Sequence, residues 1–199
     1  MTLIIVLEIV LLGGLFFAAI RANARRVWNA KTLAYAGLAI ALSFALSFIR
    51  LFRMPQGGSV TPGSMLPILF FSAAFGVGPG LTVGFVYGIL QYLQGGWFLN
   101  VWQFLLDYIL AYAALGIAGI YRKFPVKQLP AFAVSTVAAV IVRIICATLA
   151  GYMFWDTAIA ASLIYNGTYL IPETVICLIL ALPLHDPVMK ILKNADRRK

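Results

Sequence analysis

Long apolar runs alternate with short polar segments along the whole chain. A helix that crosses a bilayer needs about 20 mainly apolar residues, so the pattern predicts seven membrane-spanning helices. These are expected at residues 2–20, 31–52, 63–77, 80–94, 100–121, 130–154 and 162–184. The third and fourth runs are short, and the helix-breaking sequence Gly76-Val77-Gly78-Pro79-Gly80 separates them. We therefore expect two tilted or partly shielded helices there.

Composition supports the same class. Hydrophobic residues make up 63% of the 199 residues and charged residues 11%, whereas soluble domains have about 45–50% and about 25%. This excludes a soluble enzyme, a disordered segment and a secreted disulfide scaffold, and it predicts an all-α integral membrane protein. Cys146 and Cys177 lie in apolar runs and are interpreted as buried hydrophobes. With a single histidine, His185, the sequence predicts no metal site.

The basic residues predict how the chain crosses the membrane. The formal net charge is +9, and strict alternation of the spans places most Lys and Arg residues on one side. That side holds the segments 21–31 and 122–127 and the tail from residue 190. Arg50 and Arg53 lie on the opposite side, and Arg143 lies within a span. By the positive-inside rule, this predicts a multi-pass protein of the bacterial plasma membrane and argues against a nucleic-acid partner.

No catalytic set is evident. The sequence has no Ser/His/Asp set, no HExxH motif and no phosphate-binding glycine loop followed by a strand. Three ionisable residues lie within spans, where charge is costly and normally faces a cavity or a partner: Asp107, Arg143 and Glu173. An internal salt bridge of Arg143 with Glu173 or Asp107 is one interpretation. For Asp107 we favour contact with a ligand.

The surroundings of Asp107 are aromatic and rich in amides. Residues expected near the same outer level of the membrane are Tyr87, Gln91, Trp97, Trp102, Gln103, Asp107, Tyr108, Trp155, Tyr165 and Asn166. An interfacial belt explains the Trp and Tyr residues. It does not explain the amides and the carboxylate, which would be unsatisfied in lipid. The cluster predicts a pocket for a flat, polar ring that can carry a positive charge.

Two rows of small residues lie on the second predicted helix. Gly37, Ala41 and Ala45 are spaced by four, and Ala39, Ser43 and Ser47 form the other row. Such rows let helix backbones approach closely in lipid. A contact within the chain and a contact with a partner protein both fit the first row.

Five segments carry a family resemblance. Residues 54–68, 84–91, 103–111, 116–119 and 162–169 resemble, in order and spacing, the thiamin-specific S-components of energy-coupling-factor (ECF) transporters. The resemblance covers about residues 31–184 and implies the six-helix S-component bundle, with the first predicted helix as an addition. It divides the chain into an extra helix with a basic cytoplasmic linker (1–30), a substrate-binding membrane domain (31–189) and a basic cytoplasmic tail (190–199).

The resemblance also implies roles for individual residues. Those that would line the vitamin pocket are Asp107, Tyr108, Gly151, Trp155, Asn166 and the aromatic Trp97. The polar cluster adds Gln103 and Tyr87 to this predicted substrate-binding set. By the same resemblance, Gly37, Ala41 and Ala45 would form the docking face for a membrane coupling subunit.

The function implied is uptake and not catalysis. A protein of this kind binds thiamin from outside the cell and delivers it with a membrane coupling subunit and two cytoplasmic ATPases, without a cofactor of its own. Two positions depart from the family: Ala147 replaces a His and Ala161 replaces a Tyr. Another ring vitamin or precursor, such as pyridoxine or hydroxymethylpyrimidine, therefore stays an alternative ligand. A stand-alone secondary transporter is a further alternative, although no internal repeat is evident.

Overall fold

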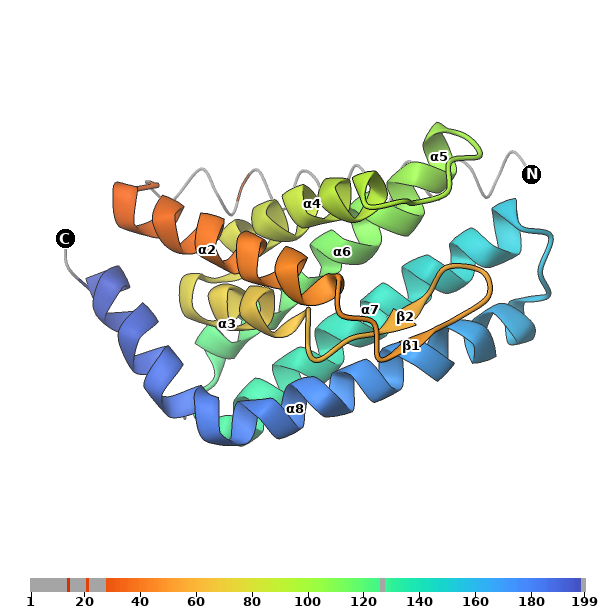
Figure 1. Cartoon of the computed structure of the whole chain (residues 1–199). Helices are drawn as coiled ribbons and strands as arrows, with labels where there is room; N and C mark the ends of the chain where they lie inside the picture. Colours follow the sequence, from red (N-terminus) through yellow and green to blue (C-terminus); the bar gives the residue numbers. More distant parts are fainter. Residues whose placement is uncertain (1–13, 15–20, 22–27, 126–127, 198–199) are drawn as a thin grey trace.

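The computed structural model describes residues 14, 21, 28–125 and 128–197, and helices dominate this part of the chain (Figure 1). The helical elements are α2 (Ala30–Ser47), α3 (Leu66–Phe75), α4 (Val77–Leu93), α5 (Val101–Phe104), the π-helix η1 (Leu105–Leu110), α6 (Ala111–Ala113), the 3-10 helix η2 (Ala114–Lys123), α7 (Leu129–Phe154) and α8 (Ile159–Arg197). Elements α5 to η2 follow one another without a break, so they form one rod. The predicted helix at 2–20 lies almost entirely outside the described residues.

The lengths of the helices agree with a membrane protein. Four described segments are long and apolar enough to span a bilayer: Ala30–Ser47, Val101–Lys123, Leu129–Phe154 and Ile159–Asn194. Helices α3 and α4 are shorter, as the sequence predicts. Gly76, with a φ of 95°, separates them, because a glycine adopts positive φ without a steric penalty.

Helix α3 is short because other helices enclose it. Figure 1 shows α3 in the middle of the bundle, and every residue from Ile68 to Phe75 is buried. The Phe70 ring stacks on Phe132 of α7 at 4.8 Å between centroids, and Phe71 packs on Phe75 at 4.7 Å. A helix surrounded by protein needs no full bilayer length, which confirms the prediction of a shielded helix.

Helix α4 lies directly against the rod that contains η1 and η2. Gly80, Gly84 and Gly88 are spaced by four on α4 and are all buried. A Cβ atom added at Gly84 would overlap the Tyr112 carbonyl oxygen, and one at Gly88 would overlap the Tyr108 carbonyl oxygen. These glycines allow backbone-to-backbone contact, the kind of packing that small residues permit in lipid.

A β-hairpin follows α2. Strands β1 (Phe52–Arg53) and β2 (Ser59–Val60) pair antiparallel, with Phe52 opposite Val60. Gly57 in the turn has a φ of 111°. The sequence predicts a helix through residue 52, but α2 ends at Ser47, and the chain turns into the hairpin instead. Figure 1 shows the hairpin alongside α7 and α8.

Helix α8 continues well beyond the predicted end of its span at residue 184. It contains Pro172, Pro183 and Pro187, and its C-terminal part turns away from the direction of its first part (Figure 1). Proline removes a backbone hydrogen bond and bends a helix. Met189 and Leu192 in the bent part are buried in the hydrophobic core. Residues 190–197, predicted as part of a basic tail, therefore continue a helix that packs on the bundle.

Candidate functional site

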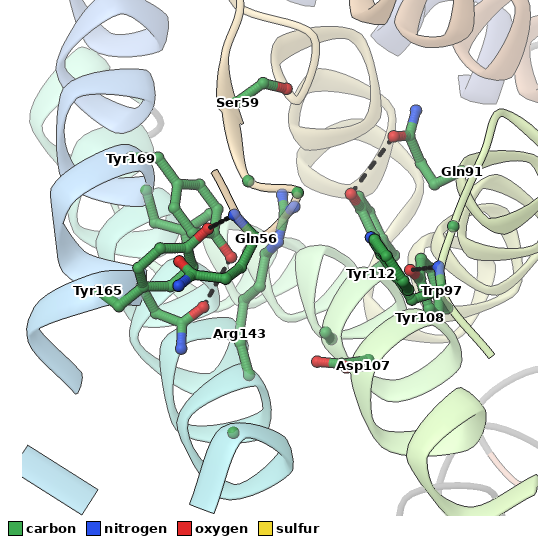
Figure 2. Close-up of a pocket in the computed structure, with 18 of the residues that line it drawn as sticks. Gln56, Ser59, Gln91, Trp97, Asp107, Tyr108, Tyr112, Arg143, Tyr165 and Tyr169 are labelled. Atoms are coloured by element: carbon green, nitrogen blue, oxygen red, sulfur yellow. Dashed lines mark hydrogen bonds between the residues drawn. The ribbon is translucent and has the colours of Figure 1, made fainter. Parts of the chain in front are cut away.

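A cavity of about 510 Å³ opens between the hairpin and the helices. This lies within the range of about 300–1,000 Å³ that is typical of small-molecule sites. Residues from α2, the hairpin, α4, η1, α6, α7 and α8 line it. Figure 2 shows side chains from the hairpin, α4, η1, α6, α7 and α8 around a common space.

Asp107 lies in the π-helix η1 of the central rod. One turn of π-helix is wider than an α-turn, and such turns are frequent at functional sites. The Asp107 Oδ2 atom accepts hydrogen bonds from Gln103 Nε2 at 2.8 Å and from Trp155 Nε1 at 3.5 Å. Gln103 is fully buried, and its Oε1 accepts from the Leu99 backbone N–H at 3.2 Å. Gln103 thereby fixes the orientation of the carboxylate.

Aromatic side chains surround this carboxylate. The Trp97 and Trp155 rings meet edge to face, with centroids 6.1 Å apart and an interplanar angle of 87°. Trp97 is 59% exposed and Trp155 38%, so both rings keep free surface at the cavity. The Tyr108 hydroxyl accepts from the Trp97 backbone N–H at 2.8 Å, which holds the Trp97 loop on the rod. A carboxylate beside free aromatic rings can bind an organic cation.

The wall formed by α7 and α8 is closely packed. A Cβ atom at Gly151 would overlap the Ser162 hydroxyl, so this glycine lets the two helices approach. The Asn166 amide is engaged at both ends: Nδ2 donates to the Ser162 carbonyl at 2.9 Å, and Oδ1 accepts from the Tyr169 hydroxyl at 2.7 Å. This network holds Asn166 and Tyr169 in place on the cavity wall.

Glu173 attaches the segment after the hairpin to α8. Its carboxylate accepts from the Thr61 backbone N–H at 2.7 Å, from the Thr61 hydroxyl and from the Ser64 hydroxyl at 2.8 Å. The turn of the hairpin is also held, because the Gln56 backbone N–H donates to the Tyr165 hydroxyl at 3.1 Å (Figure 2). The hairpin is thus fixed to α8 at two places.

The internal salt bridge considered for Arg143 is not found. Over residues 28–125 and 128–197, no ion pair within 4.0 Å joins Arg143 to Glu173 or Asp107. The Arg143 guanidinium carbon instead lies 4.0 Å from the centroid of the Tyr112 ring. The Glu173 carboxylate already accepts hydrogen bonds from hydroxyl and backbone amide groups, so it does not need a cationic partner.

Six of the eight predicted substrate-binding residues line the cavity: Trp97, Asp107, Tyr108, Gly151, Trp155 and Asn166. Gln103 and Tyr87 are buried and are not among the lining residues. The Tyr87 hydroxyl donates to the Ser43 carbonyl at 3.2 Å, and its ring packs on Tyr112 at 5.3 Å. These two residues support the residues that face the cavity.

Sequence reasoning missed part of the lining. Tyr112 and Arg143 meet inside the cavity, and Arg50 and Arg53 line it as well. Tyr112 lies four residues after Tyr108, and this helical spacing places both on one face. The spacing of Tyr108 and Tyr112 was therefore a usable signal in the sequence. The two strands of the hairpin gave no periodic signal, because short strands in a glycine-rich loop leave little periodicity.

Comparison with known proteins identifies the family. A family model described as "Thiamine transporter protein" (Thia_YuaJ) matches residues 33–193. The chain belongs to this family. It is also 36% identical to the thiamine transporter ThiT of Bacillus subtilis, with 71% of this chain and 82% of the relative covered. The family resemblance expected from the sequence is therefore confirmed.

A solved structure of ThiT from Listeria monocytogenes has the same fold. The TM-score is 0.63, the sequence identity is 20%, and 83% of this chain and 95% of that chain are covered. The family consists of transporters and not enzymes. Together with the apolar helices, family membership makes this chain a multi-pass protein of the bacterial plasma membrane, as the sequence predicts.

Proposed function

We propose that this protein is the substrate-binding membrane subunit of an ECF-type uptake transporter and that it binds thiamin from outside the cell. The observation that carries this proposal is the Asp107 carboxylate beside Trp97 and Trp155 in the cavity between the hairpin and the helices. Thiamin has a cationic thiazolium ring and an aminopyrimidine ring. A carboxylate and aromatic faces suit the first ring, and amide and hydroxyl groups suit the second.

The lining residues take different roles in this proposal. Asp107 pairs with the cationic ring, Trp97 and Trp155 stack on the ligand, and Tyr108 and Asn166 shape the walls. Gly151 keeps α7 and α8 close enough for the pocket to form. The buried Gln103 and Tyr87 are positioning residues, since they contact Asp107 and Tyr112 and do not line the cavity.

The described residues support a six-helix bundle, and the additional helix before it stays a prediction from the sequence. The described part supplies the six: α2, α3, α4, the rod from α5 to η2, α7 and α8. The basic segments 21–31 and 122–127 would face the cytoplasm by the positive-inside rule. The hairpin and the cavity beneath it would then face outside, where the vitamin arrives.

The exposed row on α2 supports docking of a coupling subunit. Gly37, Ala41 and Ala45 are all exposed, and a Cβ atom at Gly37 would meet nothing within 4 Å. The other row on α2, with Ser43 and Ser47, is buried in the bundle. A membrane coupling subunit with its two cytoplasmic ATPases would pack on the exposed row and supply the energy, because the sequence contains no phosphate-binding loop.

Thiamin binding to the purified protein in detergent tests this proposal. Asp107→Asn should weaken thiamin binding by about 10-fold or more, because a charge-assisted contact contributes about 1.5–3 kcal/mol. The loss for an uncharged thiamin analogue should be smaller. Asp156→Asn is the matched control, since Asp156 is exposed and does not line the cavity. Equal losses for both ligands would remove the charge argument.

Ala147 and Ala161 favour a second candidate ligand. Both line the cavity, and both are smaller than the His and Tyr of the family, so the pocket has lost two ring contacts. A B6 vitamer such as pyridoxine, or hydroxymethylpyrimidine, could then be the substrate. A thermal-shift panel distinguishes them, because a ligand stabilises by RT ln(1 + [L]/Kd). Uptake into vesicles without any coupling module would instead indicate a secondary transporter.

A further inference from the structure

The last part of α8, residues 187–194, has a direction and a surface of its own, and we call it the basal segment. Figure 1 shows it rising along the end of the bundle at which α2 begins, at an angle to the preceding part of α8. Met189 and Leu192 bury their side chains in the core. Lys190 and Ile191 are exposed, Ile191 by 56%. The basal segment is therefore two-sided, with one face on the bundle and a basic, partly apolar face directed outward.

The basal segment packs on the end of η2, which is also basic. The Lys193 ammonium lies 5.6 Å from the centroid of the Tyr121 ring. The next residue of η2, Arg122, donates from Nη1 to the Ala74 carbonyl in the last turn of α3 at 2.7 Å. Lys123 follows and is exposed. These contacts bring the basic ends of η2 and α8 together beside the end of α3.

The start of α2 lies at the same end of α3. Trp28, just before α2, stacks on Phe71 of α3 with ring centroids 6.5 Å apart, and Lys31 in the first turn of α2 is exposed. Tryptophan is enriched at the level of the lipid headgroups. A half-buried tryptophan beside an exposed lysine indicates that this end of the bundle lies at the membrane surface.

The charge at this end is strongly one-sided. Segments 21–31, 122–127 and 186–199 hold most of the 15 Lys and Arg residues of the chain but only two acidic residues, Asp186 and Asp196. Asp186 is paired with Nδ1 of the buried His185 at 2.7 Å. A positive surface at the edge of a bilayer is complementary to anionic lipid headgroups, which attract basic residues next to membrane spans.

The exposed apolar residue favours a lipid surface over a water-soluble acidic protein. Ile191 directly follows Lys190, and Leu184, just before the proline bend, is 40% exposed. An interfacial helix buries such side chains at the boundary between headgroups and acyl chains, while its lysines stay with the headgroups. The mixture of basic and apolar exposed residues fits this boundary.

We propose that the basal segment is an interfacial helix that binds anionic phospholipids, with Lys190 on the headgroup and Ile191 at the acyl-chain boundary. By the positive-inside rule this is the cytoplasmic leaflet. The inference does not depend on the ligand of the cavity, because the 18-residue helix α2 separates this end from the hairpin. One lysine near an anionic membrane surface strengthens association by about 5-fold.

A fluorescent reporter in the basal segment provides the first test. Ile191→Trp adds one tryptophan at an exposed position, and the signal of the four natural tryptophans is subtracted with the unaltered protein. In phosphatidylcholine nanodiscs, a small share of brominated phosphatidylcholine should quench the reporter. Brominated phosphatidylglycerol at the same share should quench it about 2-fold or more strongly, because the lysines enrich it locally.

Two results of this test would overturn the inference. No quenching by either lipid would place the basal segment in water, away from the bilayer. Equal quenching by the two lipids would show contact with the membrane without selection of an anionic headgroup. High salt should reduce the preference for phosphatidylglycerol, because it screens exposed charges.

The second test assigns the preference to Lys190. In the Ile191→Trp protein, Lys190→Gln should lower the ratio of quenching, phosphatidylglycerol over phosphatidylcholine, toward one, and Lys190→Arg should keep it high. Asn194→Gln is the matched control, since Asn194 is exposed on the same segment and the change leaves the charge unaltered. An unchanged ratio in Lys190→Gln would contradict the inference.

A third measurement tests a protein partner in place of lipid. Lys190→Gln should not alter capture of the proposed coupling subunit in lipid-free detergent, nor thiamin binding, because Lys190 does not line the cavity. Lost capture with an unchanged quenching ratio would assign the surface to a protein and overturn the inference. Failure of thiamin to bind the unaltered protein would overturn the proposed function alone, since the quenching ratio is measured without ligand.

Discussion

Two rows of small residues with the same spacing lie in different places in this molecule. Gly80, Gly84 and Gly88 on α4 are buried against the rod from α5 to η2. Gly37, Ala41 and Ala45 on α2 are exposed. Spacing by four shows only that a helix can be approached closely. Whether the approaching backbone belongs to the same chain depends on the fold.

Larger side chains introduced into the two rows should therefore impair different properties of the protein. The row on α4 touches backbone atoms of its own chain, which cannot move aside without shifting a whole helix. The row on α2 is exposed, and a Cβ atom added at Gly37 would meet nothing within 4 Å. Substitutions in the first row should therefore damage folding, and those in the second row should damage only assembly.

Filling the buried row should have the largest effect. Gly84→Leu would drive a side chain into the Tyr112 carbonyl and the Ala113 Cα, and overpacking of a core costs about 1–3 kcal/mol or more. We expect little monodisperse protein on size-exclusion chromatography. Gly37→Leu is the matched control, because the same side chain has open space at Gly37. Normal yield and stability of Gly84→Leu would show that α4 can move away from the rod.

Filling the exposed row should abolish transport while the protein stays folded. Under the proposed function, Ala41→Trp should leave ligand affinity in detergent nearly unchanged but prevent ATP-dependent uptake with the proposed coupling module, because a large ring separates two helices. Vesicle uptake and pull-down of the coupling subunit measure this.

Ile141→Trp on α7 is the control for the exposed row, since Ile141 is also exposed and apolar but belongs to another helix. Coupling-subunit capture at normal yield by Ala41→Trp would contradict the docking face. A large loss of ligand affinity would instead place the row in the internal packing of the bundle.

The smallest effect is expected from Gly37→Ala. An alanine at an exposed helical position is favoured over glycine by about 0.5–1 kcal/mol, and a Cβ atom there meets nothing within 4 Å. Thermal unfolding of the isolated protein should therefore move slightly upward. A clear loss of stability would reveal that Gly37 packs against another part of the same chain.

The helices were largely predictable from the sequence, because apolar runs in a membrane protein have few alternatives. The break at Gly76 and the shielded α3 follow from glycine chemistry and from length. The continuation of α8 beyond Pro183 was not predictable, since three prolines in one segment normally argue against a single helix. The burial of Met189 and Leu192 in the core favours the continued helix.

The sequence predicted those site residues whose charge is unusual within a membrane span. It did not predict those whose position depends on how neighbouring helices pack. Asp107 was predicted to face the pocket because a carboxylate within a membrane span is costly and normally faces a cavity or a partner. Gln103 and Tyr87 were predicted to line the pocket, but both are buried and neither is among the lining residues. Which face of a helix meets a cavity depends on neighbours that the sequence does not show. The contact between Arg143 and Tyr112 joins two distant segments, and no local pattern predicts it.

The bent end of α8 has a practical consequence for anyone who shortens or labels the protein. The segment after Pro187 looks dispensable in the sequence because it is short and basic. Yet trimming it would remove Met189 and Leu192 from the core and would take Lys193 away from the face of Tyr121, where it lies 5.6 Å from the ring centroid. The hydroxyl of the same Tyr121 lies 3.3 Å from Nε2 of the buried His185. Affinity tags and fluorescent fusions therefore belong after the final helical turn.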